Sequence, residues 1–75
     1  MEKKLSEMKY GTQGIVRSIK GDLGNKVAGM GIRVNKRIRM ATKQPIKGPV
    51  VVTVDESNIS LGLGIAENII VEVEK

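Results

Sequence analysis

Three features of the 75-residue sequence predict a small, mainly β protein. Short apolar runs alternating with polar residues recur along the chain and indicate strands, whereas one stretch alone has helical spacing. Nine Gly and two Pro separate these runs, which indicates tight turns. A chain this short forms one domain with a thin core. We therefore expect a single domain over residues 1–75, folded as a partly open barrel of about five strands, of the SH3-like kind.

The first strand is predicted over residues 15–19, after a turn that Gly11 and Gly14 bracket. The only predicted helix follows it, near residues 22–30, with Asp22 placed to accept backbone N–H bonds of the first turn. Its two glycines weaken this helix by about 1 kcal/mol each relative to Ala, so it depends on tertiary packing. Gly31 suits the left-handed residue that commonly follows a helix end.

One face of this helix is apolar. Leu23, Val27 and Met30 fall at i, i+4 and i+7, which places them in one stripe. Such a stripe is core by default, but a loosely held helix can also expose part of it to a partner, since Met suits adaptable recognition surfaces. Both interpretations stay open from the sequence.

The second predicted strand, residues 36–41, alternates charged and apolar side chains. Ile38 and Met40 are expected to face inward, and Arg37 and Arg39 to face water. The wider basic cluster is either an electrostatic docking face or an ordinary solvated strand face. It comprises Arg33, Lys36, Arg37, Arg39, Lys43 and Lys47.

The remaining strands form a hairpin and a closing strand. Residues 50–54 and 59–61 are predicted to pair through a turn at 55–58. Residues 65–68 form at most one helical turn, and residues 69–73 alternate as the last strand.

The composition excludes several kinds of chemistry. The sequence has neither His nor Cys, so it cannot build a His or Cys zinc site or a catalytic triad, and we expect no enzymatic activity and no cofactor. Gly24–Gly29 begins like a phosphate-binding loop but lacks the Lys and hydroxyl that should follow. A weak divalent-cation site at Glu72 and Glu74 remains open, with solvated surface as the simpler interpretation.

The net charge of +5 is unevenly spread. Residues 1–54 hold 12 basic and 3 acidic side chains, a balance of +9, and residues 55–75 hold 1 basic and 5 acidic, a balance of −4. This favours an anionic partner. Nucleic acid is the alternative partner, but barrel-type readers stack bases on aromatic residues and this chain has only Tyr10, so none is expected.

The N-terminal residues are polar, with no signal-peptide apolar region. The longest apolar run is Val50-Val51-Val52, extended after Thr53 by Val54, and it is far too short to span a membrane. We therefore expect a cytoplasmic protein. An exposed sheet edge also leaves a weak homo-oligomer open.

Several motifs, taken in order, resemble the ferrous iron transport protein A (FeoA) family across almost the whole chain. They are Leu5-Ser6-Glu7-Met8-Lys9, Gly14-Ile15-Val16, Val27-x-x-Met30-Gly31-Ile32, Gly48-Pro49-Val50, Ile59-Ser60-Leu61 and Ala66-x-x-Ile69-x-Val71. The chain departs from the family where Val34-Asn35 replaces a frequent Pro-Gly, and where Lys26 is the one basic residue of the helix.

The resemblance implies a small cytosolic accessory that docks on the GTP-binding domain of FeoB, the membrane ferrous iron transporter. It also implies a fold similar to the SH3-like domain of iron-dependent repressors. The expected partner-facing residues lie on the helix, at its end and on the basic strand: Leu23, Lys26, Val27, Met30, Gly31, Arg37 and Arg39.

Overall fold

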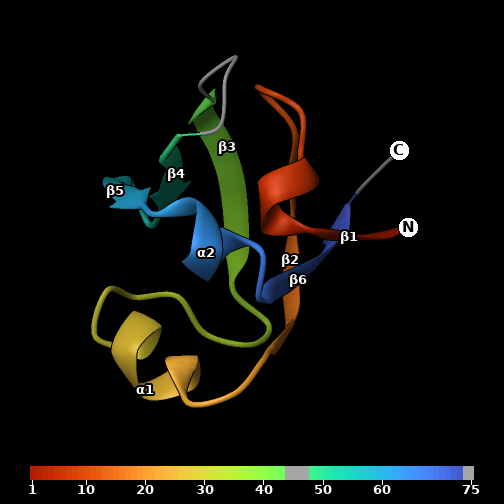
Figure 1. Cartoon of the computed structure of the whole chain (residues 1–75). Helices are drawn as coiled ribbons and strands as arrows, with labels where there is room; N and C mark the ends of the chain where they lie inside the picture. Colours follow the sequence, from red (N-terminus) through yellow and green to blue (C-terminus); the bar gives the residue numbers. More distant parts are fainter. Residues whose placement is uncertain (44–47, 74–75) are drawn as a thin grey trace.

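The computed structural model of the chain describes residues 1–43 and 48–73. These residues form a six-stranded sheet with two short α-helices and one 3-10 turn (Figure 1). In chain order the elements are β1 (Glu2–Lys4), η1 (Leu5–Glu7), β2 (Gln13–Ile19), α1 (Leu23–Ala28), β3 (Arg37–Lys43), β4 (Val50–Val54), β5 (Ser57–Leu61), α2 (Leu63–Ala66) and β6 (Ile69–Val73).

All neighbouring strands are antiparallel, in the order β1-β6-β2-β3-β4-β5. The pairing shifts by one residue between Val16 and Ser18 in β2 and between Met40 and Thr42 in β3. Such bulges bend a strand and increase its twist. The sheet therefore curls, and Figure 1 shows its two edge strands, β1 and β5, on opposite sides of the molecule. The predicted mainly β, SH3-like architecture is confirmed.

The inner face of the curled sheet carries the core. In β3, Ile38 and Met40 are fully buried, whereas Arg37 and Arg39 are exposed, as the alternation predicts. The buried side chains come from almost every element and form one cluster: Leu5, Met8, Val16, Val27, Ile32, Ile38, Met40, Val50, Val52, Val54, Leu61, Ala66, Ile69 and Val71.

The N-terminal segment was not predicted as structure, yet it supplies the sixth strand and two core residues. β1 pairs with β6 in the register Lys3↔Val71, although every residue of β1 is charged and shows no alternation. Leu5 and Met8 follow it and are fully buried. The expected count of about five strands was therefore one short among the described residues.

Three local predictions need correction. Asp22 stands at the N-terminal cap of α1, but its side chain makes no capping hydrogen bond. The hairpin turn is shorter than expected, because Asp55 and Glu56 alone form it, with φ of 50° and 69°. The helical turn α2 begins at Leu63 instead of residue 65, and the Asn68 side-chain amide donates to the carbonyl oxygen of Gly64 at 2.8 Å.

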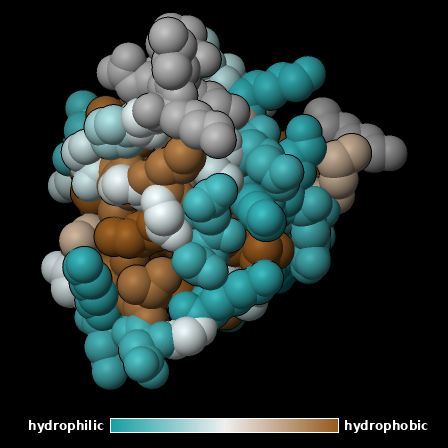
Figure 2. Space-filling model, in the orientation of Figure 1, coloured by the Kyte–Doolittle hydropathy of each residue, from teal (hydrophilic) through white to brown (hydrophobic). Residues whose placement is uncertain are grey.

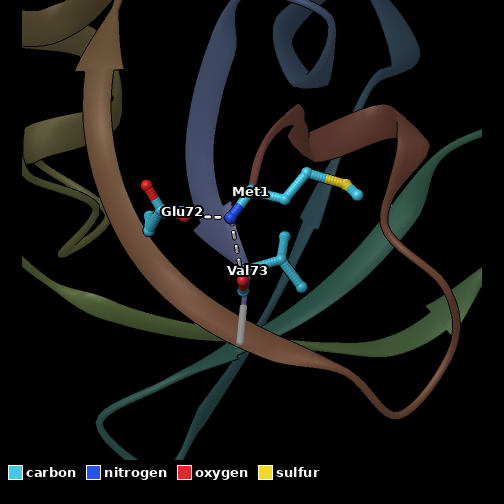
Figure 3. A network of polar contacts seen from close by, with 3 residues as sticks. All are labelled: Met1, Glu72 and Val73. Carbon is cyan, nitrogen blue, oxygen red and sulfur yellow. Dashed lines mark hydrogen bonds and ion pairs between the residues drawn. The ribbon is translucent and has the colours of Figure 1, made fainter. Parts of the chain in front are cut away.

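β6 lies between β1 and β2, so the acidic end of the chain is inserted into the basic part. The Met1 amine forms an ion pair with the Glu72 carboxylate and approaches the Val73 carbonyl oxygen at 3.5 Å (Figure 3). The charge separation along the sequence therefore does not produce two separate regions of the folded sheet. Within the described residues, no helix is long and apolar enough to cross a membrane.

Candidate partner-docking surface

The end of α1 is held by a pair of backbone hydrogen bonds around Gly31. The Ile32 N–H donates to the Val27 carbonyl at 3.0 Å, and the Gly31 N–H donates to the Ala28 carbonyl at 3.0 Å. Gly31 has φ +90°. This is the Schellman arrangement, in which a left-handed glycine lets the chain fold back over the last turn. Val27 and Ile32 are both fully buried and supply its apolar contact.

The predicted partner-facing residues of the helix differ in their exposure to solvent. Lys26 is exposed, Leu23 is half-buried, and Met30 at the helix end keeps 37% of its surface exposed. Val27 is fully buried, which corrects its place among the partner-facing residues: it anchors the helix from beneath. We name the segment Leu23–Gly31 the helix-end surface; Leu23, Lys26 and Met30 are its accessible predicted side chains.

A tight turn leads from this surface into β3. The Lys36 N–H donates to the Arg33 carbonyl at 3.0 Å, and Asn35 has φ +75°. A positive φ at the third residue is typical of a type II turn, which favours Pro-Gly at its centre. Val34-Asn35 keeps this backbone because Asn tolerates the left-handed region. Val34 is left 50% exposed, a feature that the sequence analysis did not single out.

The basic residues of β3 face outward as expected, but the wider cluster is not uniform. Arg37 and Arg39 share the outward face of β3, and Arg33 is exposed in the preceding turn. Lys36 forms an ion pair with Asp55 of the β4–β5 turn. The side chain of Lys43 and the whole of Lys47 lie outside the described residues. Arg37 and Arg39 therefore belong to the strand that begins directly after the 33–36 turn, and this turn follows the helix-end surface in the chain.

The second helix adds apolar surface that the sequence analysis missed. Leu63 and Ile65 of α2 are half-buried, and Ile65 packs against the core. Figure 2 shows apolar surface gathered over α2 and between α2 and α1. The apolar residues of this helix are visible in the sequence as Leu63-Gly64-Ile65-Ala66. Gly62 and Gly64, however, indicated a break in the chain at this point, and not the start of a helix.

The carboxylates do not assemble a metal site in residues 1–43 and 48–73, where no group of three or more acidic side chains gathers around one point. Glu72 is already engaged by the Met1 ammonium, and Glu74 lies outside the described residues. The hydrogen bond from that ammonium lowers the pKa of Glu72 below its ordinary value, against a smaller opposing effect of desolvation, with Arg17 adding to the lowering.

An open depression of about 350 Å³ is lined by no residue of the helix-end surface. Its rim carries both charge signs, from Glu2, Lys3, Lys4, Glu7 and Lys20, around Ser18 and Ile70. This mixture gives no preference for an anion or a cation, and none of the predicted partner-facing residues lines it. Tyr10 is 72% exposed in the loop between η1 and β2, and so lies outside the strands as predicted.

Comparison with known proteins shows which family and which solved structures the chain is similar to. The FeoA domain family model matches residues 3–73. A crystal structure of an iron uptake regulatory protein, FeoA, superposes with a TM-score of 0.92 at 30% identity, over 99% of this chain and 100% of that one. No match was found among curated proteins.

Two further structures share the fold. Stenotrophomonas maltophilia FeoA, solved with zinc and described as a prokaryotic SH3 domain protein, has a TM-score of 0.79 at 23% identity, over 96% of this chain and 89% of that one. A manganese-dependent transcriptional repressor has a TM-score of 0.88 at 24% identity, over 97% of this chain but 42% of the repressor. With the family match extending over nearly all of its length, the chain belongs to the FeoA family.

Proposed function

We propose that this chain is a small non-enzymatic adaptor of ferrous iron uptake, which docks on the cytosolic GTP-binding domain of a FeoB-type transporter and supports or regulates iron(II) transport. The observation that carries the proposal is the family match over residues 3–73. The full-length similarity to a FeoA crystal structure supports it. The place of action would be the cytoplasm, at the inner face of the membrane that holds the transporter.

The docking site is the helix-end surface. Met30 offers a flexible, polarizable side chain at an exposed helix end, and Leu23 extends the apolar contact. Lys26 borders it with a positive charge, and Gly31 fixes the backbone that presents Met30. Arg37 and Arg39 on the outward face of β3 would steer an acidic partner, which raises the association rate more than the final affinity.

An adaptor fits the residues better than an iron carrier does. The sequence contains neither His nor Cys, so carboxylate and carbonyl oxygens are its main metal ligands, and these favour magnesium or calcium over ferrous iron. The family contribution to iron transport would therefore come through contact with the transporter.

The test is a binding measurement on the purified cytosolic domain of the transporter without nucleotide, with GDP and with a non-hydrolysable GTP analogue. We expect saturable binding in at least one state, and reduced ferrous iron uptake in a strain lacking this chain. Absence of binding in every state, together with normal uptake in the deletion strain, would overturn the proposal.

A further inference from the structure

The curled sheet has two edge strands, and they differ in how well they are protected against pairing with another chain. Among the strands that the structure describes, β1 borders only β6, and β5 borders only β4. An edge strand presents backbone N–H and C=O groups that can pair with another chain, so proteins usually protect such strands with charges, Pro, short length or a covering segment.

The β1 edge has several of these protections. It is three residues long, and each residue is charged: Glu2, Lys3 and Lys4. The Lys4 N–H, which would otherwise point outward, donates to a carboxylate oxygen of Glu7 at 3.1 Å. A partner strand would have to displace that side chain and bury charged groups.

Within residues 1–43 and 48–73, the β5 edge has none of these protections. Its five residues, Ser57-Asn58-Ile59-Ser60-Leu61, include no charge and no Pro. Figure 1 shows β5 as the outermost strand on its side of the sheet. The side chains of Asn58 and Ser60 are exposed, and Ile59 is half-buried against the margin of the core.

The hairpin geometry identifies which backbone groups of β5 point outward. A two-residue turn with both φ positive makes Val54 and Ser57 a hydrogen-bonded pair, and such pairs alternate along an antiparallel ladder. Val52↔Ile59 is then also hydrogen-bonded, whereas Asn58 and Ser60 turn their N–H and C=O groups away from β4. The Thr53 hydroxyl donates to the Asn58 side-chain oxygen at 2.8 Å, as expected for the closer side chains of a non-hydrogen-bonded pair.

We propose that β5 pairs with β5 of a second copy of this chain, antiparallel and around a two-fold axis at Ile59. In this register Asn58 faces Ser60 of the second copy, so each outward N–H and C=O of both residues gains a partner. The geometry selects this register over the other symmetric ones. A two-fold axis at Asn58 would match Asn58 only with Asn58 of the second copy, and an axis at Ser60 would match Ser60 only with Ser60 of the second copy.

The second copy fits this edge better than an arbitrary strand does, because the pairing is self-complementary. Ile59 meets Ile59 of the second copy on the core-facing side, which extends the apolar cluster across the junction. Glu56 falls opposite Gly62 of the second copy, so the acidic turns do not face one another. An interface of one short strand is small, so we expect a weak, concentration-dependent dimer.

Cross-linking tests the register directly, since the chain has no Cys of its own. Ile59 bonds to β4 through its backbone, so its pairing with Ile59 of the second copy would be a non-hydrogen-bonded one. The two Cα atoms of such a pair lie about 4.5 Å apart, which is within disulfide range. We expect Ile59→Cys to form a reducible covalent dimer under mild oxidation. The matched control is Lys3→Cys, a half-buried residue at the centre of the protected edge strand, which should stay monomeric.

Amide hydrogen exchange and sedimentation on the unmodified chain make the test independent of the cysteine variants. Exchange at Asn58 and Ser60 should slow as concentration rises, while that at Lys4 stays constant, and the mass should move from 8.1 kDa toward twice that value. Ser60→Pro removes an outward donor that an edge strand can spare, and should keep the chain monomeric; Ser60→Lys, which adds an edge charge, should do the same.

A mass of one chain at every concentration, with unchanged exchange at Asn58 and Ser60, would overturn the inference. Protection of these two amides by the transporter domain without any self-association would also overturn it, and would assign the edge to a strand of that partner.

Discussion

At the residue scale, backbone angles at single glycines hold the helix-end surface in place. Gly31 has φ +90°, and an added Cβ there would meet no atom within 4 Å, so its importance is conformational and not steric. Gly24, inside α1, has no positive φ and equally open space. The two positions therefore separate backbone strain from helix propensity.

Substituting these glycines by Ala should have opposite effects. Gly31→Ala should lower the free energy of unfolding by about 1–2 kcal/mol, because L residues resist the left-handed region. Gly24→Ala should raise it by about 0.5–1 kcal/mol, because Gly is a poor helix former. Urea unfolding of both variants checks this; a neutral Gly31→Ala would contradict the description of the helix end.

Glu72 gives a pH-dependent prediction. Its pKa is lowered in the folded chain by the Met1 ammonium, so the pair stabilises the fold above the ordinary pKa of about 4.5 and this contribution is lost as pH falls through the lower folded value. Glu72→Gln should therefore destabilise the chain at pH 7 and have a smaller effect at a pH well below 4.5, where this carboxyl group becomes protonated. Glu67→Gln, at an exposed carboxylate, is the control in thermal unfolding at both pH values.

At the scale of elements, Gly14 shows how closely the strands approach. A Cβ at this buried position would overlap the Glu72 carbonyl oxygen and lie 2.7 Å from Cγ1 of Val71. No side chain fits between β2 and β6 here, although Gly14 itself lies within strand β2. The glycine was expected to bracket a turn, and its actual role depends on β6, which lies far away in the sequence.

Gly14→Ala should destabilise the chain by about 1–3 kcal/mol, the usual cost of forcing an extra carbon into a packed site. Chemical denaturation measures it, and Gly64→Ala in α2, where nothing lies within 4 Å of the added Cβ, serves as the control. Equal stability of the two variants would contradict the observed pairing of β2 with β6.

The sequence predicts those elements in which the order of apolar and polar residues indicates which side chains are buried. β3 alternates charged and apolar residues, and β4 and β6 are short runs rich in Val and Ile, which favour strands; the structure has all three close to the expected positions. β1 was missed because its charged residues carry no pattern, and its strand form depends on pairing with β6. In the candidate site, helical spacing placed Leu23, Val27 and Met30 in one stripe, but it could not tell which of the three packs into the core; in the fold Val27 is fully buried there.

At the scale of the whole molecule, the sheet order redistributes the charge. Because β6 lies between β1 and β2, the last strand of the acidic segment, residues 55–75, lies beside two strands of the basic segment, residues 1–54. The exposed side chains of Arg37 and Arg39 form a local positive surface on the outward face of β3, and this local surface is the one that we propose for steering a partner. We propose that this charge steers an acidic partner toward the helix-end surface, which precedes β3 in sequence.

The most direct test of this account is the affinity of the transporter's cytosolic domain for three forms of the chain: the unchanged protein, Met30→Asp and Tyr10→Asp. Tyr10 is the control because it is exposed in a loop that Figure 1 shows at the opposite end of the molecule from α1. We predict that the unchanged chain and Tyr10→Asp bind equally, and that Met30→Asp binds at least about tenfold more weakly, a loss of about 1.4 kcal/mol. Equal binding by all three forms, or binding by none, would contradict docking through the helix-end surface.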